Sequence, residues 1–212
     1  MLNPSAAFLS KAKSRNLQKT NFFVGSASNI PIANGTFDIV VSGLALNFFP
    51  DLNAAFSEMK RVLKQGGNIA AYVWDYAGKM QFLRLFWDTA REIDTEVYKL
   101  DEGDRFQVCH AETLHQTFDK AGLINVKSSY LDIDTVFKNF DDYWNPFLGG
   151  QGPAPSYLAS LSAEKQEELK SAIQRKLSVK PEDSIKLMAR AIAIQGKLNY
   201  KLRTSTVCHY TG

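Results

Sequence analysis

The chain has 212 residues, with 25 Lys and Arg against 22 Asp and Glu, and 45% of its residues are hydrophobic. These values are ordinary for one globular domain and exclude disordered, collagen-like and coiled-coil classes. The net charge is only +3, and no dense run of Lys and Arg occurs, so we expect no nucleic-acid binding. The best apolar run, residues 39–49, is shorter than the roughly 18 residues that a membrane span needs.

No secretory signal is visible at the N-terminus, so we expect a cytoplasmic protein that does not contact membranes. Cys109 and Cys208 lie far apart in sequence and form no C-x-x-C pair, which predicts free thiols in a reducing compartment. The three histidines are scattered and show no metal-ligand spacing, so we expect no metal site.

The N-terminal segment predicts a helix followed by two strands. Asn3 and Pro4 suit the N-cap and first position of a helix through about residue 12. A strand is expected at residues 21–25, and the pair Asn34-Gly35 is a strong turn signal. Residues 37–44 read FDIVVSGL, with little alternation, which predicts a parallel strand buried on both faces.

The next segment gives the clearest pattern in the sequence. Apolar residues recur with helical spacing over residues 52–63, Asp51 suits the N-cap, and Gly66-Gly67 suits the end of the helix. Residues 68–74 are again apolar and predict a strand. A strand, a helix and a strand in this order predict a right-handed crossover and a parallel sheet.

The second half predicts three further helices and two strands. Helices are expected at about residues 83–93, 111–121 and 162–177, and strands at 124–137 and 185–196. Residues 94–107 are polar and predict a loop or an insertion, and residues 149–155 (GGQGPAP) are the strongest breaker cluster in the chain.

Several spaced motifs in residues 22–76 resemble class I S-adenosylmethionine-dependent methyltransferases of the type 11, small-molecule branch. The "L-P-F" and "F-D-x-V" steps of that family become residues 30–32 and 37–40 here, and its "E-x-x-R-V-L-x-P-G-G" becomes residues 58–67. The family's "G-D-A" step becomes residues 25–27. The pieces occur in the family's order, which makes the match specific.

The resemblance implies an α/β fold: a Rossmann-like class I methyltransferase sheet with helical cap segments. The strands at 21–25, 37–44 and 68–74 should be parallel, and those at 124–131 and 185–196 should pair antiparallel. The family's Gly-rich turn after its first strand is not found, and residues 1–5 resemble the end of its second strand. We therefore expect an N-terminally truncated domain over residues 1–198, a cap or insertion at 139–183 and a tail at 199–212.

The resemblance also implies where S-adenosyl-L-methionine would bind. Ligands of doubly wound sheets bind at the carboxyl ends of strands. By position, the cofactor contacts would come from Asn3, Ser26, Ala27 and Ser42. Asn3 replaces the family's acidic residue for the ribose, and Ser26 replaces the aspartate that faces the adenine amino group. Both replacements shorten or neutralise the expected side chain.

The implied activity is methyl transfer to a small, apolar or aromatic molecule. Substrate contacts would come from Asn47, Trp74, Tyr76 and Trp144, because aromatic side chains commonly line ligand pockets. Asp75 follows a strand end and is the candidate general base, with His110 and His115 as further candidates. Alternatively, these aromatic side chains pack the cap over the sheet.

A second reading stays open beside the enzyme. The chain would then be a non-catalytic or incomplete methyltransferase-like protein that needs a missing N-terminal segment or a partner. A sheet without a central strand would deprive Val40, Val41, Ile69 and Ala71 of neighbours, and its free edge would favour self-association.

Overall fold

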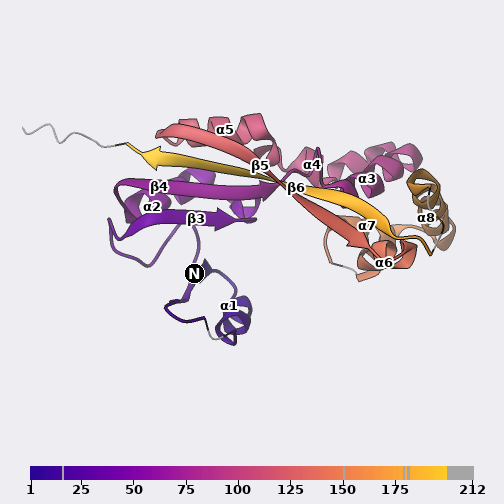
Figure 1. The fold of residues 1–212 in the computed structure, drawn as a ribbon, viewed down its shortest axis with the longest axis horizontal. Helices are drawn as coiled ribbons and strands as arrows, with labels where there is room; N and C mark the ends of the chain where they lie inside the picture. The colour runs from indigo at the N-terminus through magenta and orange to yellow at the C-terminus, as the bar shows by residue number, and fades with distance from the viewer. Residues whose placement is uncertain (16, 150, 179, 181, 200–212) are drawn as a thin grey trace, which may run out of the picture.

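The computed structural model describes residues 1–212 except 16, 150, 179, 181 and 200–212. It contains two sheets with helices around them (Figure 1), as the predicted α/β class requires. The smaller sheet pairs β1 (Leu2–Asn3) with β2 (Phe23–Val24) in parallel. The larger sheet has four strands in the order β3-β4-β6-β5.

The four-stranded sheet combines one parallel pair with two antiparallel pairs. β3 (Phe37–Gly43) runs parallel to β4 (Leu63–Trp74), which confirms the predicted parallel pairing of these strands. β6 (Ile185–Leu198) runs antiparallel to β5 (Leu123–Phe137), as predicted, and it also runs antiparallel to β4. The strand predicted at residues 21–25 is reduced to β2, and it pairs with β1 rather than with β3.

Four predicted helices lie within about two residues of their expected bounds, whereas the N-terminal helix starts later and the helices at 102–105, 140–144 and 153–160 were not predicted. Asp51 is the predicted N-cap of α2, and its carboxylate accepts a hydrogen bond from the Ala54 amide at 2.9 Å. Helix α1 begins at Ala6 with Ser5 as N-cap, so the predicted start at Asn3 and Pro4 is wrong, because Asn3 is extended and pairs with Val24. The helices are α1 (Ala6–Lys13), α2 (Leu52–Val62), α3 (Gln81–Ile93), α4 (Glu102–Arg105), α5 (Ala111–Lys120), α6 (Phe140–Trp144), α7 (Pro153–Ser160) and α8 (Ala163–Leu177). Short 3-10 turns are η1 (Leu46–Phe48), η2 (Thr95–Lys99), η3 (Gln107–Cys109) and η4 (Asn145–Gly149).

The predicted helix stop at Gly66-Gly67 is wrong. Helix α2 ends at Val62, and β4 begins at the next residue and contains both glycines. Gly66 has a φ of 72°, which favours glycine. A Cβ on Gly67 would lie 2.8 Å from the backbone oxygen of Asp38, so glycine lets β4 approach β3 at their register shift.

Two hydrophobic cores lie at opposite ends of the long β5–β6 ribbon. In the first, α2 and α5 cover one face of the sheet, where Ile192 and Ile194 of β6 are buried. In the second, α3, α6, α7 and α8 pack where β6 begins, around Ile185. Ile185 and Ile192 are an odd number of residues apart, so they point to opposite faces of the strand. Each end of the ribbon thus buries a different face (Figure 1).

The face of the sheet opposite α2 is largely open. Ile39 and Val41 of β3 are 58% and 60% exposed, so the prediction that this strand is buried on both faces is wrong. The reason is that α2 and α5 pack on the opposite face of the sheet, and neither hydrophobic core includes Ile39 or Val41. Ile69 and Ala71 are nevertheless buried, because they point toward the core with α2, so the predicted loss of neighbours does not apply to them.

Candidate functional site

The candidate site lies where β3 and β4 end. These parallel strands bring their carboxyl ends to one edge of the sheet, where doubly wound folds bind ligands. The chain leaves β3 through Leu44, a non-glycine residue with a left-handed φ of 50°, and enters η1. It leaves β4 through Asp75 and Tyr76. A left-handed Leu costs about 1 kcal/mol or more, and such strain concentrates at functional sites.

Three aromatic rings gather at this edge. The Phe106 ring lies 5.4 Å from that of Phe48, edge to face, and 5.7 Å from that of Tyr76. Phe48 comes from η1 and is 62% exposed, and Tyr76 follows β4. Of the predicted substrate residues, the structure places Tyr76 in this group, and Trp74 precedes it at the end of β4. Phe48 and Phe106 were not predicted, because the fold alone brings them to Tyr76.

Two polar atoms at the same edge are buried without a partner among the described residues. They are the Ser42 hydroxyl and the Asn47 side-chain amide nitrogen, both predicted site residues. A buried polar group without a hydrogen bond costs about 1–3 kcal/mol. Natural folds retain few such groups, and a ligand that pairs with them would recover that free energy.

The other predicted cofactor residues lie near the ends of the small sheet. Asn3 is in β1, and its side-chain oxygen accepts a hydrogen bond from the Ser5 amide at 2.8 Å. Ser26 follows β2, and its hydroxyl accepts one from the Ser28 amide at 3.2 Å. The Gly25 amide donates to the Asn3 carbonyl at 3.3 Å, so Asn3 and the Ser26-Ala27 step lie close together. Ser42 belongs to the other sheet.

Asp75 forms a tight turn after β4. One carboxylate oxygen accepts from the Gly78 amide and the other from the Lys79 amide, both at 3.0 Å. A Cβ on Gly78 would lie 2.5 Å from the carboxylate, so glycine is required for this approach. Both oxygens therefore stabilise the loop that carries Tyr76.

Replacing Asp75 by alanine should lower the free energy of unfolding by about 1–2 kcal/mol, because two backbone N–H groups lose their acceptor, as at a helix N-cap. Urea denaturation would measure the change. Asp75→Asn keeps one acceptor oxygen and should recover part of the loss. Equal stability of the alanine variant and the unmodified chain would show that water replaces the carboxylate without cost.

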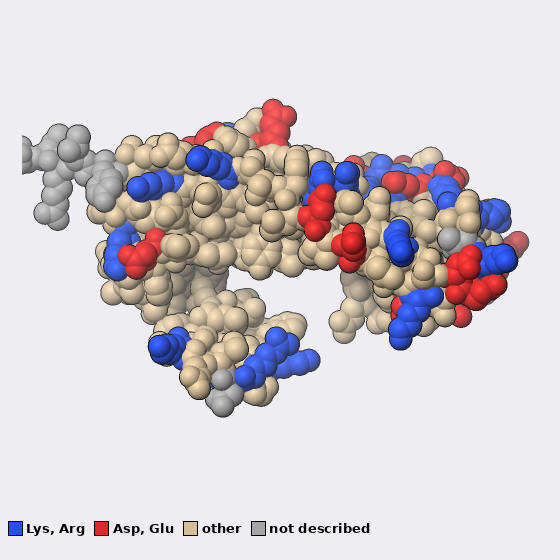
Figure 2. Space-filling view, viewed as in Figure 1, with Lys and Arg blue, Asp and Glu red and all other residues tan. Residues whose placement is uncertain are grey.

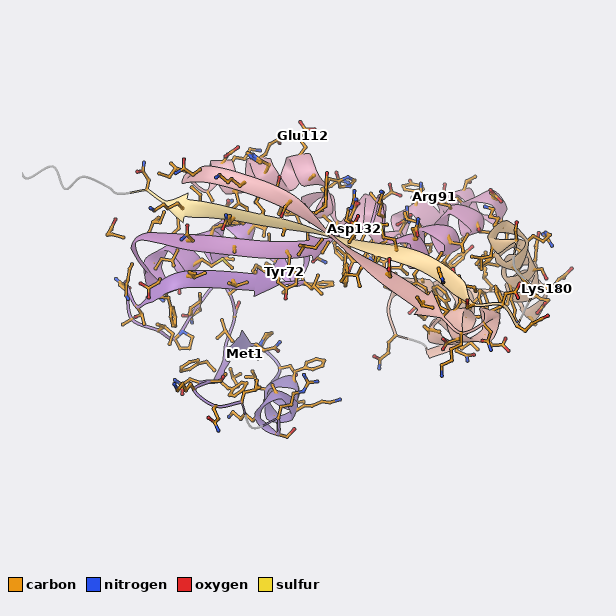
Figure 3. All side chains as sticks on the ribbon, viewed as in Figure 1. Met1, Tyr72, Arg91, Glu112, Asp132 and Lys180 are labelled. Atoms are coloured by element: carbon orange, nitrogen blue, oxygen red, sulfur yellow. The ribbon has the colours of Figure 1, made fainter. Side chains whose placement is uncertain are left out.

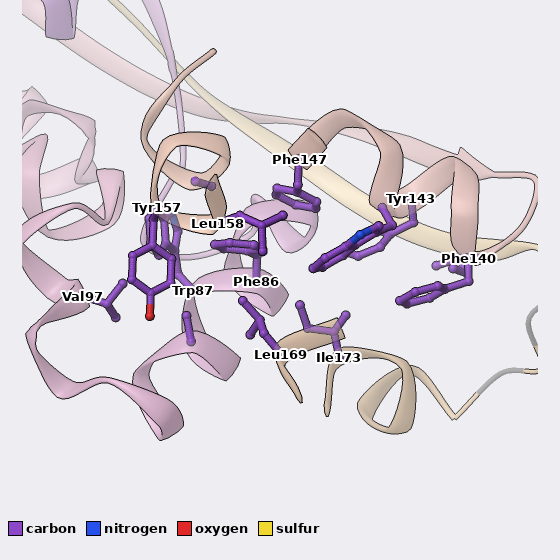
Figure 4. Close-up of a cluster of buried hydrophobic side chains, with 14 residues drawn as sticks. Phe86, Trp87, Val97, Phe140, Tyr143, Phe147, Tyr157, Leu158, Leu169 and Ile173 are labelled. Atoms are coloured by element: carbon purple, nitrogen blue, oxygen red, sulfur yellow. The ribbon is translucent and has the colours of Figure 1, made fainter. Parts of the chain in front are cut away.

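The predicted substrate residue Trp144 is corrected by the structure. Its side chain is only 5% exposed and stacks on Phe140, with the ring planes 13° apart. It belongs to the aromatic core formed by α3, α6, α7 and α8 (Figure 4), whereas Tyr76 packs against the other core. Packing of the cap, the alternative weighed for these aromatic residues, is what the structure shows for Trp144.

A group of buried titratable residues borders the site and was not predicted. Glu102 is 8% exposed and accepts a hydrogen bond from the Trp87 indole nitrogen at 2.6 Å. Burial raises the pKa of Glu102, and burial together with the nearby Cys109 and Glu102 raises the pKa of Tyr76 to about 12. Burial and then the Asp75 charge raise the pKa of Cys109 to about 12. Both shifts favour the protonated phenol and the protonated thiol at neutral pH.

Helix α4 brings these groups to the site by close backbone contact. A Cβ on Gly103 would lie 3.0 Å from the Ala77 Cα, in the turn that follows Tyr76. The candidate base His110 contacts the Gly103 carbonyl at 3.0 Å, and His115 contacts Asp119 on the exposed face of α5. Cys208 and the predicted tail at 199–212 lie outside the described residues, apart from Asn199.

The described part of the chain holds no cluster of three His, Cys, Asp or Glu side chains that could bind a metal. Within the same part, none of the helices combines the length and apolar character of a transmembrane span. A hollow of about 390 Å³ lies elsewhere, between α3, α8 and the start of β6. Its lining includes Arg84, Lys176 and Lys186 and none of the predicted site residues.

Comparison with known families matches residues 1–71 to the family model described as "Methyltransferase domain". The curated relative demethylmenaquinone methyltransferase of Staphylococcus aureus (strain JH9) is 28% identical over 127 residues, which cover 55% of this chain and 53% of the relative. The chain thus spans about half the length of the curated relatives it matches.

Two solved structures share the fold. A protein of Anaeromyxobacter dehalogenans, provisionally described as a type II methyltransferase, gives a TM-score of 0.61 at 15% identity, over 94% of this chain and 80% of that one. Phosphoethanolamine N-methyltransferase 2 of Haemonchus contortus, in complex with S-adenosyl-L-methionine, gives 0.50 at 16% identity, over 94% and 43%. At these identities the likeness concerns the fold, and it agrees with the predicted Rossmann-like class.

Proposed function

We propose a methyl-transfer function for this chain, which belongs to the class I methyltransferases of the type 11 branch. The donor would be S-adenosyl-L-methionine, and the acceptor a small molecule with an apolar or aromatic part. The proposal is carried by the edge where β3 and β4 end: three aromatic rings contact one another there, and the Ser42 hydroxyl and the Asn47 amide, on the segment that leaves β3, are buried without a partner among the described residues. The S. aureus relative, whose name gives a quinone precursor as acceptor, supports an aromatic substrate.

The residues present fit such a cofactor at the end of β3. The buried Ser42 hydroxyl can donate or accept one hydrogen bond, and the Asn47 amide nitrogen can donate one. Asn3, Ser26 and Ala27 would supply further contacts from the ends of β1 and β2. The bound cofactor supplies a methyl group already activated on a sulfonium, so the chain's own part is to orient the two reactants and exclude water.

The acceptor would lie against the rings of Phe48, Tyr76 and Phe106. Flat aromatic surfaces favour a ring or an apolar chain in the acceptor. Asn47 and Trp74 would border this surface on the sides of β3 and β4. If the acceptor loses a proton, Asp75 is the proposed base, and its two existing hydrogen bonds fix where its oxygens lie.

Replacing Ser42 by alanine tests whether its buried, unpartnered hydroxyl binds the cofactor. The variant should be about 1 kcal/mol more stable without ligand, because it removes an unsatisfied buried hydroxyl. It should also bind S-adenosylhomocysteine about tenfold more weakly, as isothermal titration calorimetry would measure. Ser128→Ala is the matched control, since Ser128 lies in the same row of the sheet, two strands away from β4.

The second candidate function is a methyltransferase-like protein that does not transfer methyl groups. The full engagement of both Asp75 oxygens in a turn favours it. The same titration decides between the two: binding of S-adenosylhomocysteine in the micromolar range supports the enzyme, and a folded chain without binding at millimolar ligand supports the second candidate.

A further inference from the structure

The hollow between α3, α8 and the start of β6 has a lining that is basic in one part and apolar in the other. Arg84 of α3, Lys176 of α8 and Lys186 of β6 line it, and none of the described Asp and Glu residues does. Its volume of about 390 Å³ lies within the range of small-molecule pockets. Three cations without a carboxylate in the same lining favour an anionic ligand.

The hollow lies far from the N-terminal segment. All of its lining residues fall between 81 and 187. They belong to the end of the molecule where Figure 3 labels Lys180, away from Met1. Basic and acidic side chains gather on the surface of this end (Figure 2). The small sheet and α1 therefore take no part in the walls of the hollow.

The apolar part of the lining is the outer layer of the aromatic core. Ile185 is 2% exposed and belongs to that core, and Leu85, Leu177 and Leu187 pack against it. Because these residues also line the hollow, a ligand there would contact apolar side chains as well as basic ones. An apolar body on the ligand would gain about 25 cal/mol for each Å² that it removes from water.

Two contacts hold the walls of the hollow together. The Gln81 side-chain oxygen accepts a hydrogen bond from the Met188 amide at 2.6 Å, which joins the start of α3 to β6. Lys176 Nζ donates to a Glu92 oxygen at 2.8 Å, which joins α8 to α3. Walls that are fixed before binding lose less conformational entropy when a ligand enters.

The basic residues keep N–H donors for a ligand. A lysine has three donors and an arginine five, and Lys176 uses one on Glu92 while Arg84 Nη2 donates to Asp101. Glu92 is largely exposed and Asp101 is fully buried, and neither lines the hollow. Lys186 is exposed and forms no ion pair within the described part of the chain.

We propose that this hollow binds a small phosphate monoester with an apolar body, such as an aryl phosphate. The binding is independent of methyl transfer, because none of the residues proposed for the cofactor or the acceptor lines the hollow. A phosphate monoester carries close to two negative charges at pH 7 and three strong acceptor oxygens, which suit three cations better than a carboxylate does. Its apolar body would contact Leu85 and Leu187.

Isothermal titration calorimetry on the full chain tests the chemistry of the ligand. Phenyl phosphate should bind at least ~10-fold more tightly than inorganic phosphate, which lacks the apolar body, and than benzoate, which carries one charge. Phenol, which is uncharged, should not bind at millimolar concentration. No binding of phenyl phosphate at that concentration, or equal affinity for inorganic phosphate or phenol, would overturn the proposal. Tighter binding of benzoate would overturn the choice of a phosphate.

Substitutions of Lys186 test the place of binding. Lys186→Gln should weaken phenyl phosphate binding about fivefold, and Lys186→Glu at least ~20-fold, because charge reversal adds repulsion to the lost attraction. Lys165→Glu is the matched control: Lys165 is exposed at the other end of α8 and does not line the hollow, so its substitution should leave the affinity unchanged. Circular dichroism should show all three variants folded. Equal effects of Lys186→Glu and Lys165→Glu would show that binding occurs elsewhere.

The phosphate of a phospholipid offers the same charge, and a vesicle assay distinguishes it from a free ester. The chain should not sediment with phosphatidylcholine vesicles that contain phosphatidic acid, because the hollow has room for one small apolar body. Sedimentation that Lys186→Glu abolishes would assign the basic residues to a lipid head group and overturn the proposal of a free ester.

Discussion

Replacement of Asp101 by alanine is expected to lower the free energy of unfolding by about 3–5 kcal/mol. The Asp101 side chain is fully buried, and one oxygen accepts from Arg84 Nη2 at 2.5 Å and from Arg91 Nη2 at 2.6 Å. The other oxygen accepts from the Gly103 amide at 2.8 Å. Without the buried carboxylate, Arg84 and Arg91 of α3 keep only the more exposed carboxylates of Asp88 and Asp104 as partners.

Chemical denaturation would measure the loss, and Asp104→Ala is the control. Asp104 also pairs with Arg91, but its side chain is 46% exposed, so its removal should cost no more than about 1 kcal/mol. Since Asp101 also anchors the turn that holds Glu102, Asp101→Ala should weaken ligand binding at the strand-end site, whereas Asp104→Ala should not. Equal costs for the two variants would show that burial of the Asp101 charge is not what matters.

The elements with strong local signals were predictable from the sequence. The helical spacing of residues 52–63 gave α2 with its N-cap, and the apolar alternation of residues 185–196 gave β6. Such patterns indicate which face of a helix or strand is buried. They can be read without knowing which other elements pack against that face. The candidate site stays a prediction, which follows from the rule that parallel strands end at the same edge of a sheet and bind ligands there.

What the sequence could not reveal depends on tertiary contacts. The apolar run of β3 reads alike for a central and an edge strand, so its exposure could not be foreseen. Asp101 and Glu102 lie in a polar segment predicted as a loop or an insertion, and in the structure they contact Arg84 and Trp87 of α3. Trp144 is an aromatic residue of the kind that commonly lines ligand pockets. In the structure it stacks on Phe140 and packs in a hydrophobic core.

The motif pair Glu58 and Arg61 acts as a clamp between α2 and the segment before β3. Arg61 Nη1 donates to the Ile32 carbonyl at 2.7 Å, and Nη2 donates to the Ile30 carbonyl at 2.8 Å. Glu58 accepts from Arg61 Nε at 2.6 Å and from the Ile30 amide at 2.8 Å. The clamp thus ties the small sheet, with the proposed cofactor residues, to the large one.

Arg61→Ala should release residues 30–34 and lower the melting temperature by about 5 °C. Hydrogen exchange at the Ile30 amide should become at least ~10-fold faster, which mass spectrometry would follow. Arg61→Lys should not restore protection, because an ammonium cannot reach two carbonyls and a carboxylate with the geometry of a guanidinium. Lys64→Ala, which removes an exposed pair with Asp38, should leave exchange at Ile30 unchanged.

The clamp should also open in acid. Hydrogen bonds from Arg61, and then from the Ile30 amide, lower the pKa of Glu58 from 4.5 to about 2. A folded-state pKa below the unfolded value gives stability that is complete above pH 4.5 and is lost as the pH falls toward 2. Protection of Ile30 should therefore decline over that interval in the unmodified chain, while Glu58→Gln should show weak protection throughout and no such decline. If both proteins lose protection in parallel, another carboxylate governs the transition and the ionised Glu58 does not hold the segment.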